Sequence, residues 1–207
     1  MWQYVGFAIG CALGFFIVTA ILIFYNKYLV MNENEESTRR LQFLKCFPNL
    51  LDKPGRLLYV GGHLRFGRAL QMTGLFKDAG WTIDIIEAFP ENVMQLNEVK
   101  WINSVIFMDV RLFQSIEKYD CVMLWHGPEH FEKAEIPTLL SKMRSYSDLI
   151  IFGCPNGKYE QDDVYGNPYE RHLSTWYKED FKELGMQSDA IGVPDARQGN
   201  IIAWLKS

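Results

Sequence analysis

The sequence predicts an α/β fold, in which a doubly wound, mostly parallel sheet has helices on both faces and is preceded by one transmembrane helix. Apolar runs of strand length recur along residues 53–207, and stretches of helical composition separate them. Strands that are apolar throughout are buried on both faces, which requires a parallel sheet covered by helices. A long uncharged stretch at the start of the chain predicts the transmembrane helix.

The uncharged stretch runs from Trp2 to Phe24 and, at about 1.5 Å of rise per residue, is long enough as a helix to cross the ~30 Å hydrocarbon layer. A cleaved signal peptide is the alternative, but the chain begins without a basic segment and shows no small-residue cleavage site after the apolar run. We therefore expect residues 1–28 to be an uncleaved membrane anchor. Lys27 and Arg39 follow it closely and no Lys or Arg precedes it, so we expect a single-pass protein with its C-terminal domain in the cytoplasm.

Gly6, Gly10 and Gly14 recur at every fourth position of the expected anchor. As a helix, this segment carries the three glycines on one stripe, where a second helix could approach closely and form a homodimer. The alternative is that glycine is simply frequent in membrane helices. Both interpretations stay open from the sequence.

Composition excludes one class of partner and indicates a compartment. The net charge of -4 offers no basic surface for a polyanion, so nucleic acid is not an expected partner. Cys11, Cys46, Cys121 and Cys154 form no C-x-x-C pair, which indicates reduced structural cysteines and agrees with a cytoplasmic domain.

The part after the anchor divides into a linker and a domain. Residues 29–52 are a polar linker followed by a short amphipathic helix that ends before Pro48. The domain covers residues 53–207. Its expected strands are Leu57 to Val60, Ile83 to Ile86, Ser104 to Met108, Tyr119 to Trp125, Asp148 to Gly153 and Asn200 to Leu205. Its expected helices are Phe66 to Ala79, Pro90 to Asn97, Glu129 to Met143 and Tyr177 to Leu184, with Gly80 and Gly185 as C-terminal caps of the first and the last.

Candidate ligand-binding residues stand where the expected strands end. In open α/β sheets, ligands bind beyond the carboxyl ends of the strands. Gly61-Gly62-His63 follows the first strand, and glycines allow a sharp turn and a close approach of backbone to ligand. Glu87 closes the second strand, where a carboxylate can accept hydrogen bonds from a ribose diol. Asp109 and His126 follow the third and fourth strands, although a carboxylate after a strand is often only the N-cap of the next helix.

With these residues, the chain resembles the class I S-adenosylmethionine-dependent methyltransferases over roughly residues 53–207. The resemblance lies in Leu58-Tyr-Val-Gly-Gly62, Ile85-Ile-Glu87, Met108-Asp109, Tyr119 to His126 with Gly127-Pro-Glu-His130, and Ile151 to Gly157. It implies a seven-stranded sheet whose last strand is antiparallel, with S-adenosylmethionine as the cofactor lying across the first strands.

The resemblance also implies roles for single residues. Gly61 and Gly62, with His63 beside them, would face the methionine end of the cofactor, Glu87 its ribose, and Asp109 with Val110 its adenine, while His126 would stand beside the transferred methyl group. The family's glycine loop reads acidic-x-G-x-G-x-G. Here those positions hold Tyr59, Gly61, His63 and Arg65.

His126 is the expected catalytic base where the acceptor must lose a proton, with Glu129 and His172 in reserve. The stretch His126-Gly-Pro-Glu-His130 also fits the H-x-x-E-H pattern of inverted zinc proteases, which needs both histidines on one helix. Gly127 and Pro128 instead favour a turn into a helix that begins near Pro128, and we expect no metal. In this second interpretation, Glu129 only complements the positive end of a helix dipole.

The loop from Asn156 to His172 is rich in groups that bind polar or aromatic ligands, and it lies where a substrate lid belongs. A self-packed surface loop is equally compatible with its composition. Two functions follow from the sequence. The first is a membrane-anchored methyltransferase that acts on a small-molecule, lipid or membrane-associated acceptor. The alternative is a membrane-tethered Rossmann-like binding or scaffold protein without catalysis.

Overall fold

The computed structural model describes residues 37–62, 68–196 and 199–206, and side chains from residue 71 onward in the second of these ranges. The chain divides into two compact units, Met1–Leu41 and Gln42–Ser207. In the first unit the described residues, 37–41, are helical. The anchor predicted at residues 1–28, with its glycine stripe, lies outside the described residues. Among the helices that are described, none combines the length and the apolar character that a membrane span needs.

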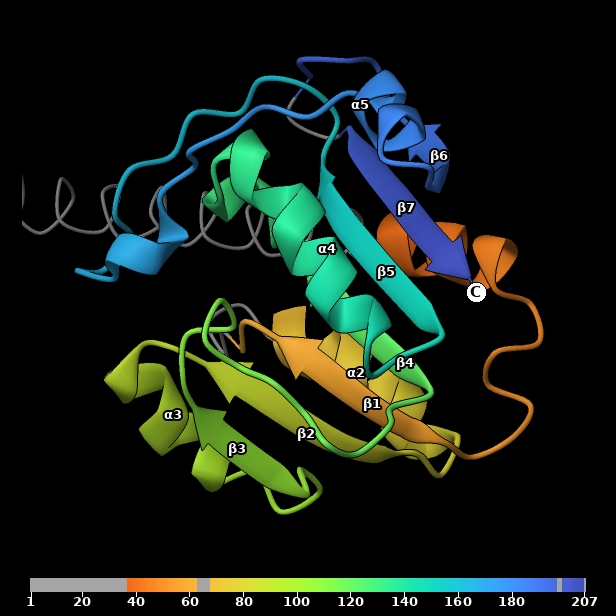
Figure 1. Cartoon of the computed structure of the whole chain (residues 1–207), viewed down its shortest axis with the longest axis vertical. Helices are drawn as coiled ribbons and strands as arrows, with labels where there is room; N and C mark the ends of the chain where they lie inside the picture. The colour runs from red at the N-terminus through yellow and green to blue at the C-terminus, as the bar shows by residue number, and fades with distance from the viewer. Residues whose placement is uncertain (1–36, 63–67, 197–198, 207) are drawn as a thin grey trace, which may run out of the picture. The chain divides into compact units, whose positions relative to one another are not determined.

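One mixed sheet of seven strands forms the second unit, in the order β3-β2-β1-β4-β5-β7-β6 (Figure 1). Strands β1 to β5 are parallel to one another, and β7 runs antiparallel to both of its neighbours, β5 and β6. The strands are β1 (Arg56–Val60), β2 (Thr82–Glu87), β3 (Ser104–Phe107), β4 (Cys121–Trp125), β5 (Leu149–Pro155), β6 (Gln187–Ile191) and β7 (Asn200–Lys206). The predicted α/β class and the antiparallel last strand are confirmed.

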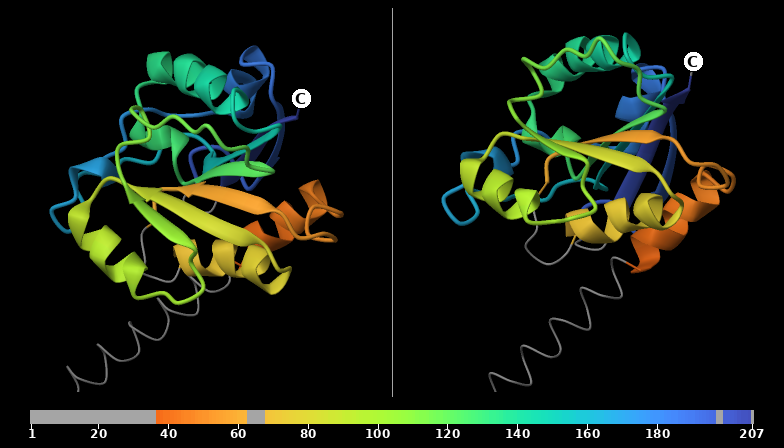
Figure 2. Two further views of the ribbon diagram at one scale, coloured as in Figure 1. Left: turned by 60° about the horizontal axis from the view of Figure 1, so that its bottom comes forward. Right: turned by 90° about the horizontal axis from the view of Figure 1, so that it is seen from below.

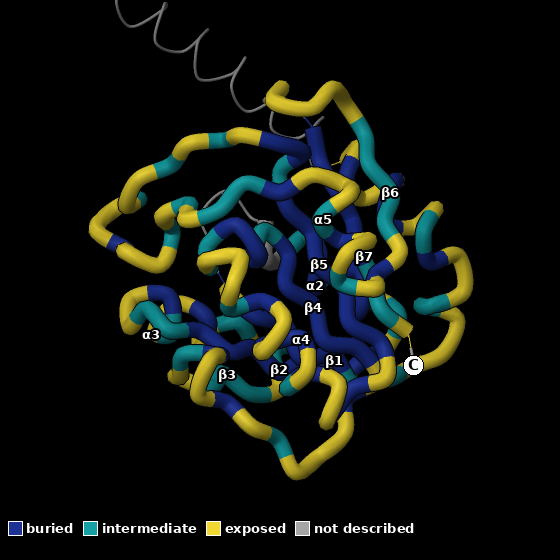
Figure 3. The backbone as a smooth tube through the Cα atoms, turned by 45° about the horizontal axis from the view of Figure 1, so that its top comes forward, coloured by how far each residue is buried: buried dark blue, intermediate teal, exposed yellow. Residues whose placement is uncertain are grey.

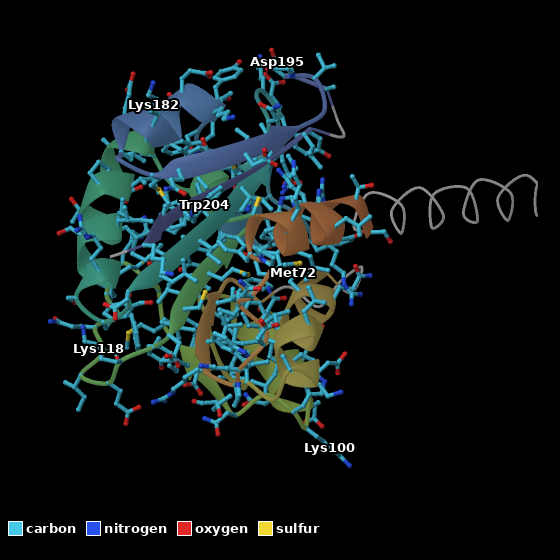
Figure 4. The ribbon with its side chains drawn as sticks, turned by 90° about the vertical axis from the view of Figure 1, so that its right-hand side faces the viewer. Met72, Lys100, Lys118, Lys182, Asp195 and Trp204 are labelled. Atoms are coloured by element: carbon cyan, nitrogen blue, oxygen red, sulfur yellow. The ribbon has the colours of Figure 1, made fainter. Side chains whose placement is uncertain are left out.

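Helices cover both faces of this sheet, as Figure 2 shows. Helices α4 (Ile136–Arg144) and α5 (Lys178–Glu183) lie on one face, and α2 (Arg68–Asp78) and α3 (Pro90–Asn97) lie on the other. Figure 4 shows the layers from the side, with Met72 of α2 turned into the core and Lys100 projecting into solvent. The doubly wound arrangement is therefore confirmed for the described part of the chain.

The core consists of two apolar clusters, one on each side of the sheet. Because successive side chains of a strand point to opposite faces, Leu58 and Val60 of β1 enter the cluster under α4 and α5. Leu57 and Tyr59 enter the other cluster, with Met72 of α2. The central strands are buried along almost their whole length (Figure 3), which explains why the sequence shows them as unbroken apolar runs.

Both predicted glycine caps are confirmed. Gly80 has a φ of 79° and donates its N–H to the carbonyl of Lys77, and Gly185 has a φ of 73° and donates to Lys182. Positive φ is the conformation that lets a glycine end a helix at low cost. Pro90 occupies the first turn of α3, also as predicted.

The prediction of one helix from Glu129 to Met143 is wrong. Pro128–His130 and Lys133–Glu135 form two separate 3-10 turns, η2 and η3, and the α-helix starts at Ile136. Phe131 between the turns is extended, with φ -115° and ψ 153°. Pro137 has no N–H to donate, so it fits in the first turn of α4 but could not stand in the interior of a longer helix.

The compact unit begins at Gln42, whereas the sequence predicts a domain from residue 53. The side chain of Gln42 donates to the carbonyl of Asp189 and accepts from the amide of Asn200, at 3.1 and 2.9 Å. Phe43 is fully buried in the cluster with Met72. The end of the helix at residues 37–46 is thus part of the compact unit.

Candidate functional site

Gly61 forms an open turn directly after β1. Its φ of 81° favours glycine, and its N–H donates to the carbonyl of Ile86 at 2.9 Å, which fixes the turn against the end of β2. No described atom lies within 4 Å of the place where a Cβ on Gly61 would stand. As far as the described residues show, the turn therefore leaves room for a ligand at the carboxyl ends of β1 and β2.

Glu87 holds this turn from the end of β2. One of its carboxylate oxygens accepts the N–H of Gly62 and the other accepts the N–H of Phe89, both at 2.7 Å. The side chain is buried, and burial raises the pKa of the Glu87 carboxyl, while the bonds from Phe89 and Gly62 act in the opposite direction. The sequence correctly places Glu87 beside the glycine turn.

Gly62 is a glycine because of packing. A Cβ at this position would lie 2.5 Å from Cδ1 of Leu96 on α3 and 2.9 Å from Cγ2 of Ile85 on β2. The close approach to Gly62 that the sequence assigns to a ligand is made in the structure by α3. His63 and Arg65, which follow Gly62, lie outside the described residues.

Asp109 and Val110 follow β3 and differ from each other in exposure. The side chain of Val110 is buried in the apolar cluster under α4. Asp109 accepts three hydrogen bonds from the guanidinium of Arg111, one from Nη2 at 2.6 Å and two from Nε at 3.0 Å. Partial burial would raise the pKa of the Asp109 carboxyl, but the hydrogen bonds and charge of Arg111 outweigh it and hold that pKa below its usual value.

His126 stands directly after β4 with a φ of 52°, a conformation that few residues with a side chain adopt. Its Nδ1 lies 3.3 Å from Oε1 of Glu129, and the two side chains are 16% and 2% exposed. Because His126 precedes the 3-10 turn that starts at Pro128, the two histidines of the H-x-x-E-H pattern do not share a helix. The geometry of an inverted zinc protease is therefore absent from this stretch.

The long loop after β5 returns to the same place and adds His172. One ligand atom each of Glu129, His130 and His172 lies within 4.8 Å of the other two. The rings of His130 and His172 meet edge to face with centroids 5.0 Å apart. Burial lowers the pKa of His130 to about 4, with the neighbouring His172 acting in the same direction, so the His130 ring is neutral at neutral pH.

The other polar side chains of this loop divide between structure and surface. Asn167 accepts the N–H of Tyr169 and Gln161 donates to the carbonyl of Glu170, so both stabilise the loop itself. Tyr165 and Tyr169 are exposed. The loop is therefore self-packed at its far end and contributes His172 at the end near the site.

Sequence reasoning missed two contributors to this site. Arg111 pairs with Asp109, and nothing in the local pattern distinguishes it from a surface arginine. The sequence around His130 is as compatible with a local hydrogen-bonding or capping role as with a catalytic one. Its Nδ1 does meet the carbonyl of Arg171 at 3.1 Å, but that contact comes from the distant loop.

Comparison with known proteins gives similarity at the level of the fold. No protein-family model matches the sequence, and no curated protein matches it. Among solved structures, the N-methyltransferase NodS from Bradyrhizobium japonicum WM9, in complex with S-adenosyl-L-homocysteine, is similar with 14% identity and a TM-score of 0.59, over 84% of this chain and 87% of NodS.

Two further neighbours agree with the first. The N-terminal domain of EvdMO1 with S-adenosyl-L-homocysteine bound has 16% identity and a TM-score of 0.57, over 83% of this chain and 81% of that domain. A DhpI–SAM–HEP complex has 13% identity and a TM-score of 0.57, over 83% of this chain and 86% of DhpI. The chain thus shares the fold of these three proteins, of which NodS is an N-methyltransferase.

Proposed function

We propose that this protein is a methyltransferase that takes its methyl group from S-adenosylmethionine. The observation that carries the proposal is the open Gly61 turn, tied through the N–H of Gly62 to the carboxylate that ends β2. In a sheet with this strand order, the turn and the carboxylate lie where a nucleoside-containing cofactor binds. NodS and EvdMO1, which share the fold, were crystallised with S-adenosyl-L-homocysteine.

The residues at the strand ends fit the parts of this cofactor. The open face of Gly61 would take the methionine end. The carboxylate of Glu87 already accepts the N–H groups of Gly62 and Phe89, and it would also accept a hydrogen bond from a ribose hydroxyl. Asp109, held by Arg111, and the backbone of Val110 would meet the adenine.

A bound sulfonium supplies an activated methyl group, and the protein has to align the acceptor with it and exclude water. His126 is the proposed base for an acceptor that must lose a proton, with Glu129 holding Nδ1 of its ring. His172, in the loop after β5, lies beside Glu129 in the same region. Acceptors of small-molecule, lipid or membrane-associated type fit this role because the sequence places an anchor before the domain.

The location is part of the proposal. Residues 1–28 would anchor the chain in a membrane with the domain in the cytoplasm, because their apolar run is uncharged and basic residues follow it. Extraction of the full chain from membranes by high salt alone would contradict the anchor. Gly6, Gly10 and Gly14 would bring two anchors together, and an in-membrane association assay unchanged by Gly10→Leu would contradict that dimer.

Cofactor binding is tested with two glycine variants of the full chain. Gly61→Ala and Gly185→Ala both put a methyl group on a residue of positive φ, and at both positions the described part of the chain leaves the space open. The backbone strain should therefore be similar, about 1 kcal/mol. By calorimetry, we expect Gly61→Ala to weaken S-adenosylmethionine binding at least tenfold and Gly185→Ala to leave the affinity within about twofold.

The outcomes separate the two functions. Equal affinity in the two variants would place the cofactor away from Gly61. Undetectable binding of millimolar S-adenosylmethionine to the folded wild-type chain would overturn the methyltransferase and favour the binding or scaffold protein.

A further inference from the structure

The cluster of Glu129, His130 and His172 joins two parts of the chain that are far apart in the sequence. Glu129 and His130 belong to the 3-10 turn after β4, and His172 follows the 3-10 turn Pro168–Glu170 in the loop after β5. The backbone holds the two parts together, since the N–H groups of Leu173 and Ser174 both donate to the carbonyl of Glu129, at 2.8 and 3.1 Å. The proximity of the three side chains therefore follows from the fold and does not depend on surface side chains that happen to meet.

Both histidine rings are oriented by backbone carbonyls. Nδ1 of His130 lies 3.1 Å from the carbonyl oxygen of Arg171, and Nδ1 of His172 lies 2.5 Å from that of Tyr159. A carbonyl oxygen only accepts, so the tautomer with the proton on Nδ1 satisfies this contact in each ring and keeps the lone pair on Nε2. Metal-binding histidines in proteins typically have this arrangement, with the second nitrogen donating to a carbonyl or carboxylate.

We propose that Glu129, His130 and His172 bind a divalent transition-metal cation of the zinc class. Two imidazole nitrogens and one carboxylate oxygen form a ligand set that zinc uses in sites with an open coordination position. Such ligands bind zinc at about 2.0–2.2 Å, so in a tetrahedral site their atoms are about 3.4 Å apart. The three ligand atoms lie within 4.8 Å of one another, so side-chain movements of roughly 1 Å would bring them to the tetrahedral spacing.

The surroundings favour such a cation over magnesium or calcium. Magnesium and calcium prefer sites made of oxygen atoms, and this site has two nitrogen ligands and one carboxylate. Glu129 is 2% exposed, so a cation would neutralise a buried carboxylate. His126, with Nδ1 3.3 Å from Oε1 of Glu129, would stand next to the cation and hold the ligating carboxylate in place.

Binding the cation would tie the loop after β5 to the turn after β4. This inference does not depend on the proposed function, because the ligands come from the fold whether or not S-adenosylmethionine binds. If both hold, the open coordination position would lie in the region where His126 is proposed to act on the acceptor.

The test uses Co²⁺, whose visible spectrum reports its coordination, with the untagged full chain after dialysis against a chelator. We expect one equivalent to bind with micromolar or tighter affinity, and one equivalent of Zn²⁺ to displace it. His130→Gln, His172→Gln and Glu129→Gln should each weaken binding by about 100-fold. Asp162→Asn, which changes an exposed carboxylate of the same loop, should leave the affinity unchanged.

Three results would overturn the proposal: no saturable binding of Co²⁺ or Zn²⁺ to the wild type, wild-type affinity in all three ligand variants, or equal loss in Asp162→Asn. Circular dichroism on each variant excludes misfolding as the cause, and His172→Gln is the decisive variant because it lies in a loop. Calorimetry with S-adenosylmethionine on the same samples tests the proposed function separately from metal binding. Gly61→Ala, which should weaken S-adenosylmethionine binding, should still bind one Co²⁺.

Discussion

At the scale of a single residue, Glu87 has both a structural role and a proposed ligand-binding role. Its carboxylate accepts hydrogen bonds from the N–H groups of Gly62 and Phe89 and so stabilises the turn. It is also the proposed ribose acceptor. Replacing Glu87 by alanine would remove both, so loss of cofactor binding in that variant would not distinguish a ligand contact from collapse of the turn.

Because the pKa of Glu87 is raised, the pH dependence of cofactor binding can distinguish its two roles. If the charged carboxylate binds ribose, S-adenosylmethionine affinity should fall as the pH drops through this pKa, beginning above the 4.5 of an ordinary glutamate. Calorimetry from pH 7.5 down to pH 4 checks this, with Glu87→Gln as the variant that cannot titrate. An affinity that is flat over this range in the wild type, or that declines identically in Glu87→Gln, would contradict the assignment.

The same shift has a consequence for stability with a defined sign. The folded-state pKa of Glu87 lies above the unfolded value, so between the two the folded state binds more protons. The contribution of Glu87 to the free energy of unfolding is therefore present below pH 4.5 and is lost as the pH rises through the folded-state pKa. This sign is opposite to that of an ion-paired carboxylate such as Asp109, whose pKa is lowered.

At the scale of elements, several hydrogen bonds attach the end of the long loop to the rest of the domain. Ser174 donates through Oγ to the carbonyl of Pro128 at 3.2 Å and accepts Nε1–H of the buried Trp176 at 2.7 Å. Together with the bonds from Leu173 and Ser174 to Glu129, these contacts attach the end of the loop to the turn after β4. The same contacts position His172 beside His130.

Ser174→Ala should loosen this attachment. The change removes one hydrogen bond and leaves Nε1–H of a buried tryptophan without its acceptor, at a cost of about 1–2 kcal/mol. Hydrogen exchange of the Leu173 and Ser174 amides, followed by mass spectrometry, should become faster. Ser145→Ala, whose hydroxyl meets only the carbonyl of Lys142 in its own helix end, is the control. Unchanged exchange at residues 173 and 174 would refute the account.

At the scale of the whole molecule, the amino ends of the strands are joined by one buried carboxylate on the edge opposite the candidate site. Asp84 of β2 is 1% exposed and accepts hydrogen bonds from Arg56 of β1 at 3.0 Å, from Asn103 before β3 at 2.7 Å and from Tyr119 before β4 at 3.1 Å. One side chain thus connects four neighbouring strands. Its burial is offset by these bonds and by the charge of Arg56.

Asp84→Ala should therefore lower the free energy of unfolding by about 3–5 kcal/mol, because it leaves a partly buried arginine and two polar side chains without their shared acceptor. Asp78→Ala, at an exposed carboxylate that pairs only with Lys77, should change it by less than about 0.5 kcal/mol. Chemical denaturation of both variants provides the comparison. A loss below 1 kcal/mol in Asp84→Ala would show that the network does not stabilise the sheet.

The sequence was sufficient for the elements whose signals are local. Central strands such as β4 are buried on both faces and contain no polar residue, so their positions and ends are readable from one segment alone. The two glycine caps and Pro90 are readable for the same reason, since each acts within a single helix end. For the same reason, the sequence places Gly61, Glu87, Asp109 and His126 after the carboxyl ends of β1 to β4 or at them, as the structure has them.

Elements at the margins of the sheet had weaker signals. β6 is polar and only partly buried, so its composition does not indicate a strand. Its hydrogen-bonded pairing with β7 makes it one. β3 is an edge strand and exposes Phe107, which is 60% exposed, so its apolar run misleadingly resembles that of a buried strand. The division of the predicted 129–143 helix depends on Pro137 and on the turn that packs after β4.

By itself, the sequence determined the alternation of strands and helices and the residues at the carboxyl ends of the parallel strands, because both depend on burial and turn formation within short segments. Only the tertiary structure decided the rest. It assigned Gly62 to packing against Leu96, paired Asp109 with Arg111 and brought His172 to Glu129 and His130. These are contacts between segments far apart in the chain, or between neighbours whose orientation the fold sets, and no local pattern encodes them.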